Sequence, residues 1–565
     1  MKNSRLLILF FSFILLAAIS MSRLFYLQIL KYKEFSALAL GQQTGIKEIS
    51  GKRGEIFFIN SRESKGAYNS GEAKSIAINK EKWNVNALPF KIEDKNNFSE
   101  ILAADINETK ESVFSKLSEG NSFAIIKKDI PQPLAQKLKS SALEGVDLEK
   151  VWARYYPQGV LASQVVGFLG GDGVGQYGIE GHYEDVLSGK SGIVEEKKGL
   201  NLINFLNQPK EDFDGADIFL TIDYNVQFQA ESLLAKAKEE IGIESGQIIV
   251  LKPDSGRVLA LANFPSFDPN QYSKEKNFEI FQNSALQKVF EPGSVFKPFT
   301  MAMALEDKKI DTGSFFTDEG FAKIGPDTLY NFNRQKYGKV SMSEIIEKSI
   351  NTGAVFLSLQ VGRTSFFNHL ENFGFTKKTG IDLQGEVSSR NEILRTGSAT
   401  GYATASFGQG IEMTPIQLAG AFSIFANRGK MISPYVVEKI EKNGAEKITK
   451  PAQPKQVISE KTAEEVTKML INVVEKGFGS SAKIEGYYLA GKTGTAEVPF
   501  EGKKGYYQDR TIQSFAGYGP ALKPQFLILV KLDNPKVPKS SLSAVPIFKK
   551  LAQYIINYWQ IPPDY

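Results

Sequence analysis

One apolar run constrains the whole chain, because it lies at the amino terminus and no later run approaches its length. It covers residues 6–22 and follows the basic residues Lys2 and Arg5. A membrane-spanning helix needs about 20 apolar residues, and apolar residues continue with helical spacing as far as Leu27. The pattern predicts a single membrane anchor over residues 6–27 and a large remainder in water.

A cleaved signal peptide and a buried core helix are the alternatives for this run. Residues 18–20 (Ala-Ile-Ser) would serve as a small-residue cleavage site. The helical spacing continues past that site, which favours an uncleaved anchor, and a core helix is a poor fit behind two basic residues at a chain end. The positive-inside rule then places the short tail in the cytoplasm and everything after residue 30 outside.

The composition excludes several kinds of chemistry. The chain has no cysteine, which removes disulfides, thiol nucleophiles, thiolate zinc sites and iron–sulfur clusters. Its only histidines are His182 and His369, and a net charge of +5 over 565 residues gives no reason to expect nucleic acid. We expect neither a metal nor an organic cofactor, and chemistry carried by Ser, Thr, Lys, Tyr, Asp or Glu.

The remainder of the chain is too long for one hydrophobic core, and its residue pattern changes near residue 215. Residues 31–210 form a mixed, polar-rich module that we interpret as non-catalytic. Residues 211–565 alternate strand-like and helix-like segments and are interpreted as one α/β domain of catalytic size. Within it, residues 216–222 predict a strand and residues 224–239 a helix. Residues 246–251 and 257–262 predict a hairpin that turns at Pro-Asp-Ser-Gly over residues 253–256. Residues 1–30 hold the tail and the anchor.

A phosphate-loop pattern, G-x-x-x-x-G-K-T over residues 486–493, offers a nucleotide-binding alternative. Such a loop needs a strand before the glycines and a helix that starts at the lysine. The polar lead-in over residues 480–486 is a poor strand. A glycine and a proline within residues 494–499 disfavour the helix. We therefore treat nucleotide binding as a remote alternative.

The same lysine belongs to a different set of three motifs. Ser294 and Lys297 stand three residues apart at the start of a predicted helix, so they share one face. Ser349 and Asn351 follow a helix whose start is marked by the capping pattern Ser-Met-Ser-Glu over residues 341–344. The third motif is Lys-Thr-Gly-Thr, made of Lys492, Thr493, Gly494 and Thr495.

Ser-x-x-Lys, Ser-x-Asn and Lys-Thr-Gly-Thr, in this order, resemble the motifs of penicillin-binding transpeptidases. Flanking segments agree, including Glu-Pro-Gly-Ser-Val-Phe-Lys-Pro over residues 291–298 and Ser-Phe-Ala-Gly-Tyr-Gly-Pro over residues 514–520. In the amino half, Arg-Gly-Glu-Ile over residues 53–56 and Arg-Tyr-Tyr-Pro over residues 154–157 agree as well. A departure lies at residues 57–60, where Phe-Phe-Ile-Asn stands in place of the Asp-Arg-Asn-Gly frequent in the family.

The whole chain is similar to a class B penicillin-binding protein. The resemblance implies an α/β (α+β) serine transpeptidase domain, an elongated mixed α/β pedestal and one anchor helix. It implies a D,D-transpeptidase that crosslinks peptidoglycan stem peptides through an acyl-enzyme on Ser294, releases D-alanine and is acylated by β-lactams. A β-lactamase-like hydrolase or β-lactam sensor shares the Ser and Lys, but usually needs no large pedestal. A hydrolase also needs a water-activating base, which the sequence does not reveal.

The chemistry requires Lys297 to be neutral if it is to deprotonate Ser294. Free lysine titrates near 10.4, and burial, a helix amino terminus and a second cation at Lys492 all lower the pKa. By resemblance, the backbone N–H groups of Ser294 and Thr495 form an oxyanion hole. The other expected roles are proton relay by Ser349, substrate orientation by Asn351, and binding of the terminal carboxylate of D-alanyl-D-alanine by Lys492, Thr493, Gly494 and Thr495.

The same resemblance implies the setting. We expect a single-pass protein of the bacterial plasma membrane with its catalytic domain outside the cytoplasm. A multi-pass glycan polymerase and division proteins are the expected partners. The compact spacing of the motifs and the direct end after the catalytic domain favour a septal role over one in elongation.

Overall fold

The computed structural model describes most of the chain after the amino-terminal segment. Apart from Met21, the anchor predicted over residues 6–27 lies outside the described residues. Within the described part, no helix combines the length and the apolar character needed to cross a membrane. The described residues are 21, 45–59, 73–119, 123–196, 213–389, 391–500 and 505–565.

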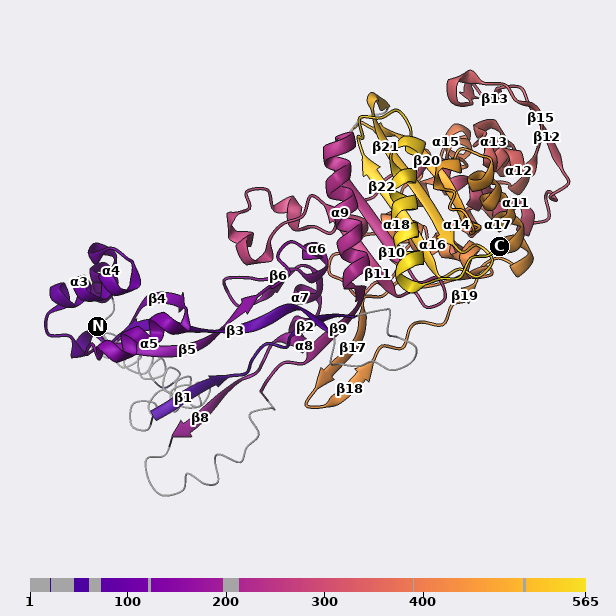
Figure 1. The fold of residues 1–565 in the computed structure, drawn as a ribbon. Coiled ribbons are helices and arrows are strands. Elements are labelled where there is room, and N and C mark those ends of the chain that lie inside the picture. The colour runs from indigo at the N-terminus through magenta and orange to yellow at the C-terminus, as the bar shows by residue number, and fades with distance from the viewer. Residues whose placement is uncertain are drawn as a thin grey trace, which may run out of the picture. The chain divides into compact units, whose positions relative to one another are not determined.

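The chain divides into two compact units (Figure 1). The smaller unit comprises residues 1–54 and 186–216, and in it β1 (Gly45–Ser50) pairs antiparallel with β8 (Ser191–Glu196). The larger unit comprises residues 55–185 and 217–565 and contains all three predicted motifs.

A seven-stranded sheet joins the amino half of the larger unit to its carboxyl half, in the order β18-β17-β9-β2-β3-β4, with β5 also paired to β3. Strand β2 pairs with β9 in parallel, so the sheet contains strands from both sides of residue 210. Helices α3 (Lys95–Ile106), α4 (Lys110–Glu119) and α5 (Gln132–Ser141) build a small apolar core with β3 and β4. The strands are β2 (Ile56–Ile59), β3 (Lys74–Ala87), β4 (Ala124–Ile130), β5 (Val146–Tyr155), β9 (Asp217–Asp223), β17 (Val437–Lys442) and β18 (Ala445–Ile448).

A five-stranded antiparallel sheet organises the carboxyl half, in the order β11-β10-β22-β21-β20. Strand β20 therefore lies at an edge of this sheet. The sequence predicted β10 and β11 as a hairpin, and the structure confirms that pairing. The bounds are β10 (Ser245–Leu251), β11 (Val258–Phe264), β20 (Ala490–Pro499), β21 (Tyr506–Gly519) and β22 (Phe526–Asp533).

Helices cover both faces of this sheet (Figure 1). On one face, α9 (Tyr224–Ile241) and α18 (Ala544–Trp559) bury an apolar core against the strands. The predicted helix over residues 224–239 is thus confirmed, and it starts there because the Asp223 carboxylate accepts hydrogen bonds from the N–H groups of the first turn. On the other face, α16 (Pro415–Ala426) contacts β10 and β22.

Shorter elements complete the larger unit. Two-stranded pairs form from β6 (Phe168–Leu169) with β7 (Gly175–Gln176), β12 (Phe315–Asp318) with β15 (Gly338–Ser341), β13 (Phe321–Ile324) with β14 (Asp327–Tyr330), and β16 (Lys430–Met431) with β19 (Lys455–Gln456). The remaining helices are α6 (Ser163–Val166), α7 (Gly178–His182), α8 (Glu184–Leu187), α10 (Ser284–Gln287), α11 (Lys297–Glu306), α12 (Met342–Glu347), α13 (Asn351–Val361), α14 (Arg363–Asn372), α15 (Ala399–Ala405) and α17 (Glu460–Glu475).

Candidate active site

Ser294 lies on a short 3-10 turn, Gly293–Phe296, that leads directly into α11. The helix tolerates Pro298 because the N–H groups of a first turn have no intrahelical partner. Nearly every side chain of α11 is buried, and Lys297 has no exposed surface. Ser294 is only half-buried, so its hydroxyl remains accessible at the end of a rigid helix.

Two glycines allow the Ser294 turn to approach strand β20. A Cβ atom at Gly494 would lie 2.8 Å from the Pro292 carbonyl oxygen and 2.4 Å from Ser514 Oγ. Gly293 has a φ of +56°, a conformation that side-chain-bearing residues rarely adopt, and its carbonyl group lies against Gly408. The Ser294 turn is therefore held between β20 and the loop around residue 408.

The second motif lies at the junction of α12 and α13. Helix α12 begins with the capping box predicted from the sequence, in which Ser341 and Glu344 bond reciprocally. Ser349 follows with a left-handed φ of +53°, a conformation that costs a non-glycine residue about 1–2 kcal/mol. Asn351 is the first residue of α13, so this turn directs Ser349 and Asn351 toward Lys297.

The third motif lies on β20 (Ala490–Pro499). Lys492 has no exposed surface and Thr493 is buried, whereas Thr495 is exposed and its hydroxyl lies 3.4 Å from Ser540 Oγ. Lys492 thus stands inside a strand rather than at the start of a helix. The structure therefore lacks the helix that a phosphate loop over residues 486–493 would require.

The three motifs meet at the Ser349 hydroxyl. Lys297 Nζ lies 3.1 Å from Ser349 Oγ and donates to the Ser349 carbonyl oxygen at 2.5 Å and to Asn351 Oδ1 at 2.7 Å. From the other side, Lys492 Nζ donates to Ser349 Oγ at 3.0 Å. Lys297 and Lys492, which are 195 positions apart in the sequence, thus contact the same hydroxyl group.

No hydrogen bond joins the Lys297 amine to Ser294 among the described contacts. Lys297 Nζ is instead directed toward Ser349 and Asn351, whose oxygen atoms lie within its reach. Catalytic hydrogen bonds are often long in the absence of substrate and tighten when it binds. Residues 294 and 297 are close in the chain, as expected, but the hydrogen-bond contacts of the Lys297 amine are with Ser349 and Asn351.

Burial sets the protonation of both lysines. Loss of solvation is the main cause that lowers the pKa of Lys297 well below its ordinary value, and the nearby Lys492 lowers it further. Burial alone lowers the pKa of Lys492 to about 7. The site therefore favours a neutral amine at Lys297, which is the state that a general base must have.

A carboxyl group beside the nucleophile was not among the predicted site residues. Glu291, three positions before Ser294, is buried and accepts hydrogen bonds from the Tyr506 hydroxyl at 3.3 and 3.4 Å. Burial raises the pKa of Glu291 to about 7. Its position in the segment Glu-Pro-Gly-Ser was visible in the sequence, but its burial was not.

A buried polar network that supports Asn351 was also missed. The Asp318 carboxylate accepts hydrogen bonds from the Asn331 side-chain amide at 2.9 and 3.0 Å and from the Thr352 hydroxyl at 2.6 Å. The Tyr330 carbonyl oxygen accepts a hydrogen bond from Asn351 Nδ2. The strands around residues 318–331 therefore fix the start of α13, and no local sequence signal announces this long-range contact.

Comparison with known proteins agrees with this arrangement. Residues 246–553 match the model of the penicillin-binding protein transpeptidase domain, and residues 49–220 match the penicillin-binding protein dimerisation domain. The chain belongs to the family of penicillin-binding proteins that carry a transpeptidase domain, as the class B resemblance predicted.

Individual relatives span nearly the whole chain. Stage V sporulation protein D of Bacillus subtilis is 32% identical and is aligned over 95% of this chain and 82% of its own length. A probable peptidoglycan D,D-transpeptidase PenA of Neisseria meningitidis is 31% identical over 79% of this chain and 75% of its own.

Solved structures share the fold. Penicillin-binding protein 3 of Mycobacterium tuberculosis, in complex with aztreonam, superposes with a TM-score of 0.71 at 24% identity, over 92% of this chain and 98% of that one. A peptidoglycan synthetase of Bifidobacterium adolescentis superposes with a TM-score of 0.72 at 22% identity, over 92% and 97% of the two chains. The mixed α/β penicillin-binding fold expected from the sequence is confirmed.

Proposed function

We propose that this chain crosslinks peptidoglycan as a D,D-transpeptidase, with Ser294 as the nucleophile and Lys297 as its base. The observation that carries the proposal is the meeting of Lys297, Lys492 and Asn351 around Ser349, beside the accessible Ser294 turn. Membership of the penicillin-binding family supports the same reaction. The substrate is a stem peptide that ends in D-alanyl-D-alanine.

In the proposed acylation step, the three motifs act together. Neutral Lys297 accepts the Ser294 proton while Oγ forms a bond to the carbonyl carbon of the penultimate D-alanine. The backbone N–H groups of Ser294 and Thr495 stabilise the resulting oxyanion. Because Ser349 Oγ lies within hydrogen-bond distance of both lysine amines, it relays the proton to the leaving nitrogen as the peptide bond breaks. Terminal D-alanine departs and the acyl-enzyme remains.

Deacylation reverses these steps with a different amine. The amino group of an acceptor stem peptide attacks the ester carbon, gives its proton to the same relay and forms the crosslink. Ser294 recovers its proton from Lys297. Asn351 orients the substrate amide, and Lys492, Thr493, Gly494 and Thr495 bind the terminal carboxylate of the donor.

Intact-mass spectrometry after treatment with a penicillin tests this assignment. The wild-type chain is expected to gain the mass of one β-lactam, because the drug carboxylate takes the place of that of the terminal D-alanine. Ser294→Ala is expected to gain none. An adduct that persists on Ser294→Ala would mean that another residue is the nucleophile.

The setting of the reaction is part of the proposal. Residues 6–27 anchor the chain in the plasma membrane, and the rest lies outside the cytoplasm. The motif of two basic residues followed by one apolar run supports this topology. Protease added to intact spheroplasts should degrade the protein, and full protection would refute the topology.

We assign the chain to septal rather than lateral wall synthesis, with a multi-pass glycan polymerase and division proteins as partners. The compact spacing of the three motifs supports this role. Depletion should produce filamentous cells with blocked septa. Rounded cells that still divide would place the enzyme in elongation.

A further inference from the structure

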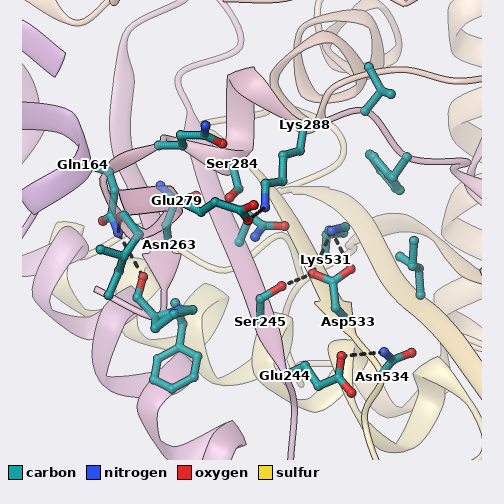
Figure 2. A pocket seen from close by; sticks show the side chains of 18 of the residues that line it. Gln164, Glu244, Ser245, Asn263, Glu279, Ser284, Lys288, Lys531, Asp533 and Asn534 are labelled. Carbon is teal, nitrogen blue, oxygen red and sulfur yellow. Dashed lines mark hydrogen bonds and ion pairs between the residues drawn. The ribbon is translucent and has the colours of Figure 1, made fainter. Parts of the chain in front are cut away.

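A cavity of about 480 Å³ lies in the larger unit at the ends of β10 and β22, apart from the three motifs (Figure 2). Its wall includes the segment that leads to the nucleophile, among it Ser284 and Phe290. None of the catalytic or carboxylate-binding residues assigned above lines it. Its volume is in the range of sites that hold small ligands.

The register of the five-stranded sheet builds the floor of this cavity. Gln247 on β10 stands opposite Asn263 on β11 and opposite Lys531 on β22. Directly opposed residues point to the same face of a sheet, so these three polar side chains form one row. All three line the cavity although they are buried, with exposed fractions of 1%, 6% and 7%.

Two buried acceptor atoms in this row lack a partner. Gln247 Oε1 and Asn263 Oδ1 have no hydrogen-bond donor within the part of the chain that the structure describes. The amide nitrogen of Asn263 donates to Asn283 Oδ1 at 3.0 Å, which leaves the oxygen as the unused atom. A buried unsatisfied polar group costs about 1–3 kcal/mol. A ligand with hydrogen-bond donors could satisfy these two acceptor atoms.

Most charged side chains around the cavity form ion pairs, and the remaining carboxylate accepts a hydrogen bond. Lys531 bonds to both oxygen atoms of Asp533, at 2.6 and 2.8 Å, and Lys288 bonds to Glu279 at 3.2 Å (Figure 2). The Glu244 carboxylate accepts a hydrogen bond from a neighbouring amide. Compensated charges and unsatisfied acceptors favour an uncharged ligand that is rich in donors.

We propose that this cavity binds a saccharide unit. Sugar hydroxyl groups, and the N–H of an acetamido substituent, would donate to Gln247 Oε1 and Asn263 Oδ1. The apolar part of the wall, formed by Val289, Phe290 and Ile512, suits the C–H face of a sugar ring. A pocket that combines an apolar wall with a few placed polar groups is the usual design of a small-ligand site.

The ligand would come from a glycan strand or from free sugar, and the chemistry of recognition is the same in both cases. The cavity adjoins the catalytic region through the chain, since Phe290 lies four positions before Ser294. It also adjoins it through the sheet, since Lys531 stands opposite Ser514 and Ser514 stands opposite Gly494. Binding to this site does not require that Ser294 react.

Isothermal titration of the purified full-length chain tests the proposal, in a buffer free of sugar-based detergent. The probes are N-acetylglucosamine and its β-1,4-linked tetramer. We expect saturable binding of at least one of them. Tighter binding of the tetramer would identify a glycan strand as the source, and equal binding per molecule would identify free sugar. Absence of binding by both probes would overturn the proposal.

Two variants test whether the sugar binds in this cavity. Gln247→Leu removes the unsatisfied amide at similar size, and Ser284→Trp fills the cavity without touching the polar row. Each is expected to weaken binding at least tenfold. Ser294→Ala is the matched control and should bind sugar like the wild type, which separates this site from the catalytic one. Unchanged binding by both cavity variants, or its loss in Ser294→Ala, would overturn the assignment.

Discussion

Two regions of the larger unit bury positive charge in opposite ways. Arg154 and Glu180 form an ion pair of 2.7 Å, with side chains 3% and 0% exposed. Lys297 and Lys492 are just as buried, yet no carboxylate lies within ion-pair distance of either amine in the described part of the chain. The first region compensates its charge, and the second leaves it uncompensated.

The difference separates a cation that stabilises the fold from an amine that can exchange its proton. A buried ion pair keeps both groups charged, and removal of one partner leaves an unpaired charge that destabilises the fold. A buried lysine without a carboxylate loses its proton instead, because desolvation disfavours the charged form. The region around Arg154 should therefore respond to mutation in stability, and the region around Lys297 in reactivity.

The strongest test of this contrast is Lys297→Arg. A guanidinium group cannot give up its proton, so acylation by a fluorescent penicillin should fall about 10²- to 10⁴-fold, the usual contribution of a general base. Lys297→Met serves as a neutral control and should lose as much activity. Circular dichroism checks that both variants fold. Near-native acylation in either variant would exclude Lys297 as the base.

The converse test is Arg154→Met, which removes the cation paired with the buried Glu180 carboxylate. The free energy of unfolding in urea should fall by about 3–5 kcal/mol, while the protein that remains folded should be acylated at the normal rate. The double variant Arg154→Met/Glu180→Leu should recover much of the loss. A slower acylation at unchanged stability would show that the pair acts on the catalytic site.

A smaller effect is expected for Lys492→Ala. Loss of attraction for the β-lactam carboxylate should cost about 2–4 kcal/mol, or about 30- to 1,000-fold in acylation rate. Because Lys492 helps to lower the pKa of Lys297, the acid limb of the pH–rate profile should also move to higher pH. Stopped-flow measurements across pH decide both points, and an unshifted acid limb would contradict the coupling of the two amines.

The smallest effect concerns stability against pH. The pKa of Lys492 is about 7 in the folded protein and near 10.4 in the unfolded chain. Between these values the unfolded chain binds the additional proton, so stability should rise with pH, by up to about 1.4 kcal/mol per pH unit. Glu231 and Glu291, whose pKa values are raised to about 7, act with the opposite sign only below that range.

Urea titrations from pH 7 to pH 9.5 measure this slope. Lys492→Met removes one titrating amine and should reduce the slope, because Lys297, whose pKa is also lowered, still contributes. The distant variant Arg154→Met should lower the curve without changing its slope. An equal slope in Lys492→Met would mean that the amine is charged in the folded state.

Local signals in the sequence predicted local structure well. The capping pattern over residues 341–344 marked the start of α12. Two apolar runs on either side of the turn at residues 253–256 marked the β10–β11 hairpin. The order and flanks of the three motifs indicated the family before any contact was known. Such signals suffice because caps, turns and alternation depend on neighbours in the chain.

Long-range register could not be predicted in the same way. The left-handed turn at Ser349, whose oxygen atoms contact the Lys297 amine, depends on how α12 and α13 pack. The polar row through Gln247 depends on how β10 aligns with β22, a strand far away in the sequence. Both are set by packing between distant segments, to which a single sequence gives no direct access.

The narrow contact at Gly494 limits how this enzyme can evolve resistance. Even the methyl group of alanine would collide there with the Pro292 carbonyl oxygen and Ser514 Oγ, and would push the Ser294 turn away from β20. Escape from a β-lactam through this position would therefore disable the reaction with the natural substrate as well. Thr495, exposed next to it on the same strand, meets no such steric limit, but its proposed contact with the substrate carboxylate would be lost with its hydroxyl. Selection by the drug should accordingly spare the glycine.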